Sequence, residues 1–292
     1  MIGLRNAARG LIDRRLHRTL KPFSYRDWMA SALIIAPHPD DETLGCGGIA
    51  CKKIASGAAT RFVFVTDGAA SHPGRLAPQI LRAKREAEAR EAVARLGATA
   101  EHITFLRYPD GEAASHVEAI AADIARLLEK YEPESVFVPH AQDFTADHAA
   151  VNAASRKALA ADGRPTSVYE YPVWYWYHWP WVGLSGHLPG LRRAVVRQSL
   201  QTRCGLFASR ALNRRAYVGD VLERKRAALA AHTSQTKRAG SDHHWPTLDD
   251  LSGGDFVRRL LSDYETFSRY EVNTQTSCVA ERTRQPAPGV EA

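Results

Sequence analysis

The segment with the densest chemistry spans residues 36–42, where one histidine and three acids share a short turn. His38 is followed by Asp40, Asp41 and Glu42. Adjacent carboxylates repel one another unless a cation or a ligand neutralises them, so a bound metal ion is a natural explanation. Imidazole nitrogen combined with carboxylate oxygen suits zinc, whose catalytic sites use three protein ligands and keep a position for water. A surface acidic turn would explain Glu42 alone but explains the whole cluster poorly.

A second polar cluster spans residues 140–148 and supplies the imidazole that a three-ligand site would still lack. It contains His140, Asp147 and His148. Taken alone, either histidine would more often cap a helix or lie on the surface than bind a metal. Asp147 cannot easily bind the same ion as its neighbour without strain, so we expect it to hydrogen-bond a metal-binding histidine.

Both clusters follow short apolar runs, at 32–36 and 135–139, that are typical of buried strands. Further elements are expected as strands at 61–66 and 102–106 and helices near 43–57, 79–96 and 114–130. This alternation predicts an α/β fold with a Rossmann-like, mostly parallel sheet flanked by helices. Ligands of such sheets bind beyond the carboxyl ends of the strands, so we expect both clusters on one rim.

With these clusters, the sequence resembles the PIG-L/LmbE family of zinc-dependent N-acetylglucosaminyl deacetylases. The family signature is a strand followed by Ala-His-Pro-Asp-Asp-Glu and, later, a short motif ending in Asp-His. Here Pro37-His-Pro-Asp-Asp-Glu42 and Asp147-His148 match it. The resemblance extends over residues 32–270 and includes Thr66-Asp-Gly68, Arg85, Glu88, Pro109-Asp-Gly111 and His232-Thr-Ser-Gln235.

The resemblance implies that His38, Asp41 and His148 bind Zn²⁺ and that Asp40 is the general base for a water molecule activated by the metal. Zinc can lower the pKa of water from about 15.7 toward about 7, and a nearby carboxylate can take the proton released. The implied reaction removes the N-acetyl group from an N-acetylglucosamine-type sugar in a glycoconjugate or glycolipid precursor. Protonated Asp40 would then deliver its proton to the leaving amine.

One departure from the family concerns the general acid, because Thr145 stands where many relatives have a histidine three positions before the last ligand. We rank Asp40 acting alone first, His140 second, and His232 as a further candidate. Two other functions stay open. One is a related zinc amidase acting on a thiol-sugar conjugate or another amide, and the other, which the threonine favours, is a catalytically silent carbohydrate-binding protein.

The resemblance also implies two substrate-binding residues, Arg85 and Asp110. In relatives the matching arginine contacts the sugar, and the matching acid binds sugar hydroxyls. Arg85 shares one side of its predicted helix with apolar residues, so it would emerge from a buried face as a substrate anchor or a structural ion pair. Pro-Asp-Gly around Asp110 is also an ordinary turn sequence.

Outside this core the sequence predicts a basic N-terminal segment at 1–30, a main domain at 31–272 and a loosely ordered tail at 273–292. The main domain would contain an aromatic-rich insertion at about 168–208 and a C-terminal α/β extension with helices at about 209–232 and 254–270. The aromatic run at 169–181 would pack in the core or at an oligomer contact, line a sugar pocket, or lie at a membrane interface. The glycines at 45–48 favour close helix packing, and no nucleotide cofactor is predicted.

The net charge of +7 favours anionic partners, although a merely solvated basic surface explains it as well. No nucleic-acid-binding motif is present, so we predict an N-acetylated sugar partner, free or linked to phosphate or lipid, and no nucleic acid. Apolar residues of the N-terminal segment raise the hypothesis of a peripheral membrane contact: Ile2, Leu4, Leu11, Ile12, Leu16 and Leu20. The spacing of the four cysteines and the absence of a secretion-signal pattern predict reduced thiols and a cytoplasmic location. The sequence makes no prediction of the oligomeric state.

Overall fold

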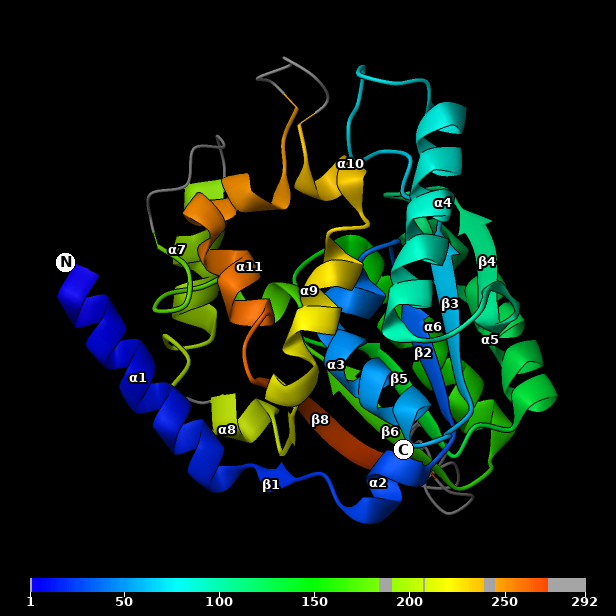
Figure 1. Cartoon of the computed structure of the whole chain (residues 1–292), viewed down its shortest axis with the longest axis horizontal. Helices are drawn as coiled ribbons and strands as arrows, with labels where there is room; N and C mark the ends of the chain where they lie inside the picture. The colour runs from blue at the N-terminus through cyan, green and yellow to red at the C-terminus, as the bar shows by residue number, and fades with distance from the viewer. Residues whose placement is uncertain (1, 184–190, 207, 239–244, 273–292) are drawn as a thin grey trace, which may run out of the picture.

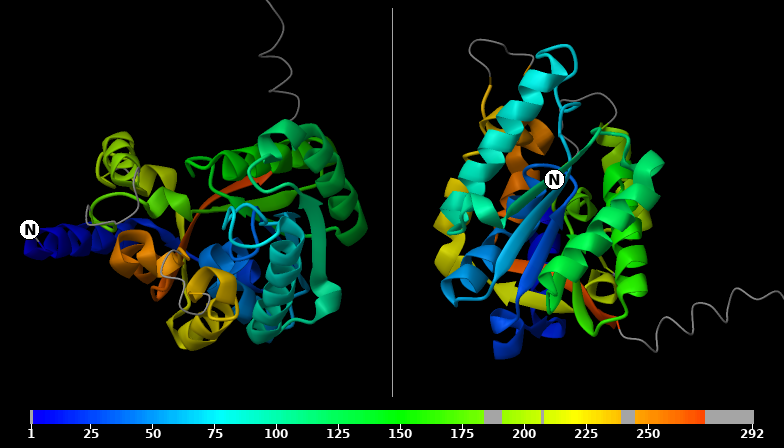
Figure 2. Two further views of the ribbon diagram at one scale, coloured as in Figure 1. Left: turned by 90° about the horizontal axis from the view of Figure 1, so that it is seen from above. Right: turned by 90° about the vertical axis from the view of Figure 1, so that its right-hand side faces the viewer.

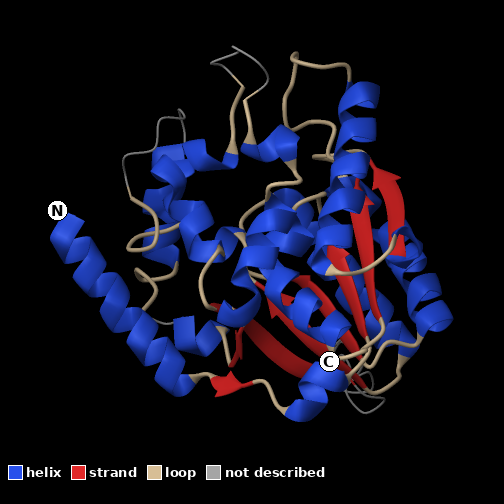
Figure 3. Cartoon of the chain, viewed as in Figure 1, coloured by secondary structure: helices blue, strands red, loops and turns tan. Residues whose placement is uncertain are grey.

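The fold is built on one twisted sheet, seen in a computed structural model that describes residues 2–183, 191–206, 208–238 and 245–272. The described strands form the order β1-β7-β8-β6-β5-β2-β3-β4, shown in red in Figure 3. They span β1 (Lys21–Pro22), β2 (Ala32–Ala36), β3 (Thr60–Thr66), β4 (Ile103–Tyr108), β5 (Ser135–Pro139), β6 (Thr166–Tyr171), β7 (Arg214–Tyr217) and β8 (Tyr264–Val272). Of these, β8 runs antiparallel to both of its neighbours, and the other pairs are parallel.

Helices cover both faces of the sheet (Figures 1 and 2). The described α-helices are α1 (Ile2–Thr19), α2 (Tyr25–Met29), α3 (Asp41–Ala55), α4 (Pro78–Leu96), α5 (Val117–Tyr131), α6 (Ala146–Asp162), α7 (Leu191–Gln201), α8 (Ala208–Ala211), α9 (Leu222–Leu229), α10 (Thr233–Thr236) and α11 (Asp255–Leu260). Short 3₁₀ helices are η1 (Ala100–His102), η2 (Ala113–His116), η3 (Trp174–Trp176), η4 (Gly219–Val221) and η5 (Leu248–Gly254). The Rossmann-like α/β fold predicted from the sequence is confirmed.

Strand β2 is apolar at every position because both of its faces are buried. In β2, Leu33 and Ile35 join the core under α5 and α6, whereas Ile34 and Ala36 join the core under α3 and α4. Successive strand side chains point to opposite faces, so a strand covered on both sides must be apolar throughout. This arrangement explains the continuous apolar runs that identified β2 and β5 in the sequence.

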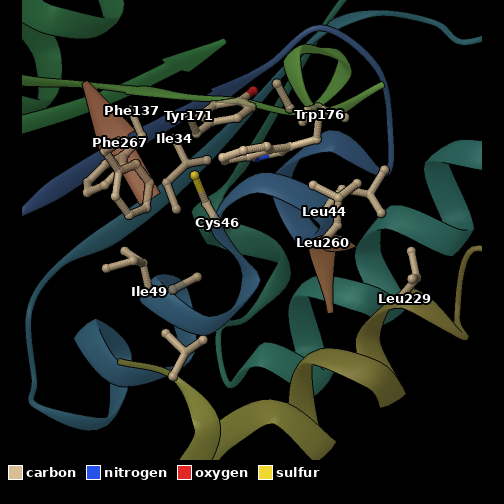
Figure 4. Packing of buried hydrophobic residues seen from close by; sticks show 14 of the residues in the cluster. Ile34, Leu44, Cys46, Ile49, Phe137, Tyr171, Trp176, Leu229, Leu260 and Phe267 are labelled. Atoms are coloured by element: carbon tan, nitrogen blue, oxygen red, sulfur yellow. The ribbon is translucent and has the colours of Figure 1, made fainter. Parts of the chain in front are cut away.

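Helix α3 packs closely against its neighbours at two of its three glycines. A Cβ atom at Gly45 would lie 2.2 Å from the ring of Tyr171, and one at Gly48 would lie 2.5 Å from Val218. Figure 4 shows Leu44, Cys46 and Ile49 of this helix among the core residues. The glycines therefore serve helix packing, as the sequence indicated.

The prediction of two continuous helices near the C-terminus was wrong, because only parts of each range are helical. Residues 209–232 contain β7 between the short helices α8 and α9, and residues 254–270 contain α11 followed by β8. In β8 the residues alternate between two faces and include tyrosine, threonine, phenylalanine and valine, which favour strands. Pairing with β6 and β7 then adds these segments to the sheet.

The basic N-terminal segment forms α1, β1 and α2. Ile12 and Leu16 of α1 are buried, but Leu4 and Leu11 are 73% and 64% exposed, so the apolar residues predicted to share one side divide between two environments. No described helix is long and apolar enough to span a bilayer. The predicted tail at 273–292 lies outside the described residues, and the proposed division into segments stays a prediction.

Candidate metal centre

Sheet topology brings the two polar clusters together. β2 pairs with β3 on one side and with β5 on the other, so the order of strands reverses at β2. Such a reversal leaves a crevice beyond the carboxyl ends of the two neighbouring strands. His38 follows β2, and His148 lies in the first turn of α6 after β5. Two segments separated by more than one hundred residues thus meet at one rim.

Two imidazoles converge on a single carboxylate oxygen at this rim. Asp41 Oδ2 lies 3.1 Å from His38 Nδ1 and 3.1 Å from His148 Nε2. One ligand atom from each of the three residues falls within 4.8 Å of the others. Ligands of a tetrahedral zinc ion at about 2.0–2.1 Å are separated by about 3.3 Å, so this spacing suits such an ion.

Each of these histidines is held on its other nitrogen by a carboxylate. His38 Nε2 lies 3.1 Å from Asp147 Oδ2, and His148 Nδ1 lies 2.8 Å from Asp143 Oδ2. Carboxylates in this position fix the ring and the tautomer of a metal-binding histidine. The position of Asp147 matches its predicted role, whereas sequence reasoning missed Asp143, although it lies in the same 140–148 cluster.

A second group of ligand atoms overlaps the first and consists of His38, Asp110 and Asp147. Both oxygens of Asp147 already accept backbone N–H groups, from Gly111 and Ala113, and Asp110 accepts one from Ala70. His148 Nε2, in contrast, is buried without a hydrogen bond in the described structure, despite its 3.1 Å approach to Asp41. Atoms that approach closely without bonding each other are suited to share an ion, so the His38, Asp41 and His148 group fits a metal better.

The charges at the rim favour additional positive charge. Burial lowers the pKa of His148, but the carboxylates of Asp41 and Asp143 outweigh it and raise the pKa to about 9. Burial likewise opposes protonation of His38, yet hydrogen bonds that its ring N–H groups donate to Asp110, Asp147 and Asp41 raise its pKa well above the usual value. A divalent cation would supply the positive charge that the carboxylates stabilise, and it would displace both protons on binding.

Asp40 lies beside this cluster in a buried, strained position. Its φ of 155° lies outside the usual range of a non-glycine residue. Arg85 is only 2% exposed, places its guanidinium 3.3 Å from Asp40 Oδ1, and donates to the carbonyl oxygens of Gly68 and Pro39. Burial raises the pKa of Asp40 to about 6 against the opposing charge of Arg85. The carboxylate is therefore held in place and can exchange a proton near neutral pH.

A pocket of about 350 Å³ opens at the cluster and is lined by both charged and apolar residues. The charged and titratable lining includes His38, Asp40, Asp41, Arg85 and Asp110. The apolar lining includes Leu44, Trp174, Pro246, Leu248 and Leu251. The segment at 246–251, which was not singled out in the sequence, thus supplies much of the wall.

Thr145 also lines the pocket, and its hydroxyl is buried without a hydrogen bond among the described residues. The structure does not bring His140 to the pocket, because its Nδ1 accepts from the backbone of Gln142 and its Nε2 faces the carbonyl oxygen of Ala211. His232 is fully buried behind the pocket, with its Nε2 2.9 Å from Glu42 Oε1. Glu42 is therefore a buried partner of His232.

The aromatic run divides between core and pocket. Tyr171, Tyr175, Trp176 and Trp181 are at most 2% exposed and belong to the main core cluster. Trp174 lines the pocket. The interpretation of the run as core packing holds for most of its members, and a pocket role falls to one side chain.

Comparison with known proteins agrees with this geometry. Residues 33–159 match the family described as PIG-L: GlcNAc-PI de-N-acetylase. No curated protein matches the chain. The predicted resemblance is thus confirmed over the segment that contains both polar clusters.

Solved structures with the same fold include an N,N'-diacetylchitobiose deacetylase from Pyrococcus horikoshii, with 20% identity, coverage of 91% of this chain and 92% of that chain, and a TM-score of 0.59. A deacetylase of the teicoplanin biosynthesis pathway has 18% identity, coverage of 82% and 98%, and a TM-score of 0.55. A 4-carboxy-2-hydroxymuconate hydratase from Pseudomonas putida has 16% identity, coverage of 84% and 96%, and a TM-score of 0.52. These likenesses establish the fold, which supports more than one reaction.

Proposed function

We propose that this chain, in which residues 33–159 form a PIG-L family domain, is a zinc-dependent hydrolase that removes the N-acetyl group from an N-acetylglucosamine-type sugar in a glycoconjugate or glycolipid precursor. The proposal rests on one observation. His38 and His148 converge on Asp41 at the floor of a pocket that also contains the buried carboxylate of Asp40. The family match supports an amide-hydrolysing enzyme, and the donor set supports zinc.

His38, Asp41 and His148 would hold the metal, with Asp147 and Asp143 orienting the two imidazoles. A zinc ion in this position would lower the pKa of a water molecule and polarise the amide carbonyl group. Two nitrogens and one carboxylate oxygen leave a position open, as catalytic zinc sites require.

Asp40 would transfer the proton during hydrolysis. Its carboxylate accepts a proton from water as the water oxygen bonds to the acetyl carbon. The same proton passes to the sugar nitrogen as the C–N bond breaks, releasing the free amine and acetic acid, which loses its own proton to solvent. A pKa of about 6 suits both steps, and the ion pair with Arg85 fixes the carboxylate. Neither His140 nor His232 lines the pocket. Their roles as proton donors stay predictions from the sequence.

Arg85 and Asp110, which line the pocket, would contact the sugar, and Trp174 would pack against its C–H groups or its aglycone. Three contacts already hold Arg85 to the protein, so we expect it to act on Asp40 as much as on the sugar. A cytoplasmic location and a peripheral membrane contact stay predictions.

The test is an acetate-release assay on zinc-loaded protein with a panel of N-acetylglucosaminyl compounds and other amide conjugates. We expect Asp40→Asn to retain zinc and to lose about 10²–10⁴-fold in rate, because a positioned base contributes about that much. His148→Ala should lose zinc. Release only from other amides would indicate the related amidase, and sugar binding without any release would indicate the silent carbohydrate-binding protein.

A further inference from the structure

A second hollow lies between α1, α9 and α11, away from the metal pocket. It has a volume of about 370 Å³, and four arginines line it: Arg9, Arg226, Arg258 and Arg259. Figure 1 shows α1 at the left edge of the molecule, with α11 between it and α9. We call this site the arginine hollow. It shares no lining residue with the metal pocket.

The arginine hollow keeps an excess of positive charge after its ion pairs are counted. Arg226 pairs with Glu223, Arg258 with Asp255 and Arg259 with Asp13, so the excess comes from Arg9. Asp13 is the one acid among its described lining residues, and its Oδ1 already accepts from Arg259 and from the indole of Trp181. Arg9 makes no hydrogen bond or ion pair within the described part of the chain. Like charges that crowd a concave surface raise its potential and attract an anion.

Arg259 is fixed before any ligand arrives. Its side chain is 9% exposed, and its guanidinium lies 3.8 Å from the ring centroid of Trp176 and 5.1 Å from that of Trp181. Its Nε is buried and has no hydrogen-bond partner in the described structure. A guanidinium stacked in this way has lost its rotational freedom, so little entropy remains to be lost when it binds an anion.

We propose that the arginine hollow binds a phosphate monoester. Guanidinium groups match the oxygens of phosphate with paired hydrogen bonds, and an anion suits a hollow where four arginines converge and Arg9 has no acidic partner in the described structure. The volume exceeds that of the phosphate group alone, and Trp181 and Leu261 line it together with the arginines, so the ester carries an organic group. This inference is independent of the proposed deacetylation, because it uses none of the metal-pocket residues.

The experiment uses the zinc-loaded full-length chain and the variant Arg9→Gln. Isothermal titration with glycerol 3-phosphate tests a soluble ester, and sedimentation with phosphatidylcholine vesicles containing phosphatidic acid tests a lipid headgroup. Phosphatidylcholine vesicles alone serve as the blank. Because the Arg9 side chain lacks partners in the described structure, Arg9→Gln should unfold at the wild-type temperature. Arg226→Gln is a second variant that removes another lining charge of the arginine hollow.

We expect saturable binding that Arg9→Gln weakens about tenfold, the loss typical of one charge-assisted hydrogen bond. Arg14→Gln is the matched control, since it removes the same charge from an exposed position of α1 outside the hollow. An Arg9-sensitive signal with glycerol 3-phosphate identifies a soluble ester. An Arg9-sensitive signal seen only with the vesicles that contain phosphatidic acid identifies a lipid. Binding that is absent in both arms, insensitive to Arg9→Gln, or equally weakened by Arg14→Gln overturns the proposal.

Discussion

Replacing Asp143 by asparagine should weaken the metal site without touching a metal ligand. Asp143 is 3% exposed and lies 2.8 Å from His148 Nδ1 through its Oδ2. Its two oxygens also accept the backbone N–H groups of Val173 and Tyr175. Asparagine keeps the shape but only one acceptor oxygen, so it removes the negative charge that faces the imidazole and leaves at least one of these N–H groups without its acceptor.

The expected loss in zinc affinity is about tenfold to hundredfold, or about 1.4–2.7 kcal/mol, because carboxylates behind metal-binding histidines contribute in this range. The same carboxylate helps to raise the pKa of His148 to about 9, so protons compete with zinc at neutral pH. Asp143→Asn relieves part of that competition. We therefore expect the lower end of the range near pH 7 and a larger loss in more alkaline buffer.

The assay is competition between the folded protein and a chromophoric chelator, with circular dichroism to check folding. Asp147→Asn should cause a similar loss through His38. Asp220→Asn is the control, because this carboxylate is 52% exposed and pairs with Lys52 away from the rim. Unchanged zinc affinity in Asp143→Asn, with folding intact, would refute the assignment of His148 as a ligand.

Three further predictions concern the scaffold. Burial lowers the pKa of His178 to about 4, so stability should be full above pH 6.5 and should fall by up to about 3 kcal/mol as the pH drops toward 4, because only the unfolded chain takes the proton there. In His178→Asn, the free energy of unfolding measured with urea should no longer show this fall between pH 6.5 and pH 4. The same pH dependence in the variant as in the wild type would contradict the prediction. Lys225→Met should cost about 3–5 kcal/mol because it leaves Glu265 buried without its cation, and adding Glu265→Gln should recover part of the loss in the same assay. Gly45→Ala should cost about 1–3 kcal/mol because its Cβ would meet Tyr171, and a wild-type unfolding midpoint would show that the helix can shift.

The parallel half of the sheet could be predicted because its sequence signals are local. The apolar runs of β2 and β5 are bounded by proline and histidine, and each is followed by a polar cluster. A parallel α/β sheet places the carboxyl ends of its strands on one rim, so the proximity of His38 and His148 follows from pattern and topology together. The structure adds that β2 and β5 are direct neighbours.

The C-terminal part resisted prediction because its strands depend on distant partners. β7 has only four residues, and it gains its place by pairing with β1 from the N-terminal segment and with β8. Such pairing is set by tertiary contacts that a local window of sequence does not contain. The pocket-lining segment at 246–251 went unnoticed for the same reason, since nothing in its sequence indicates that it lies beside the metal cluster.

Asp143 shows a different limit, because its residue type was visible but its partner was not. Within the 140–148 cluster, Asp143 and Asp147 are equivalent candidates to orient a histidine, and sequence order favours a local pairing for each. The structure pairs Asp143 with His148 in its own cluster but pairs Asp147 with His38 in the other cluster. The crossed contact links the two segments through a hydrogen bond in addition to the shared carboxylate of Asp41. Zinc binding and the mutual position of β2 and α6 should therefore be coupled. Asp147→Asn and Asp143→Asn, which weaken zinc binding similarly, should lose similar parts of the rise in unfolding temperature that zinc causes.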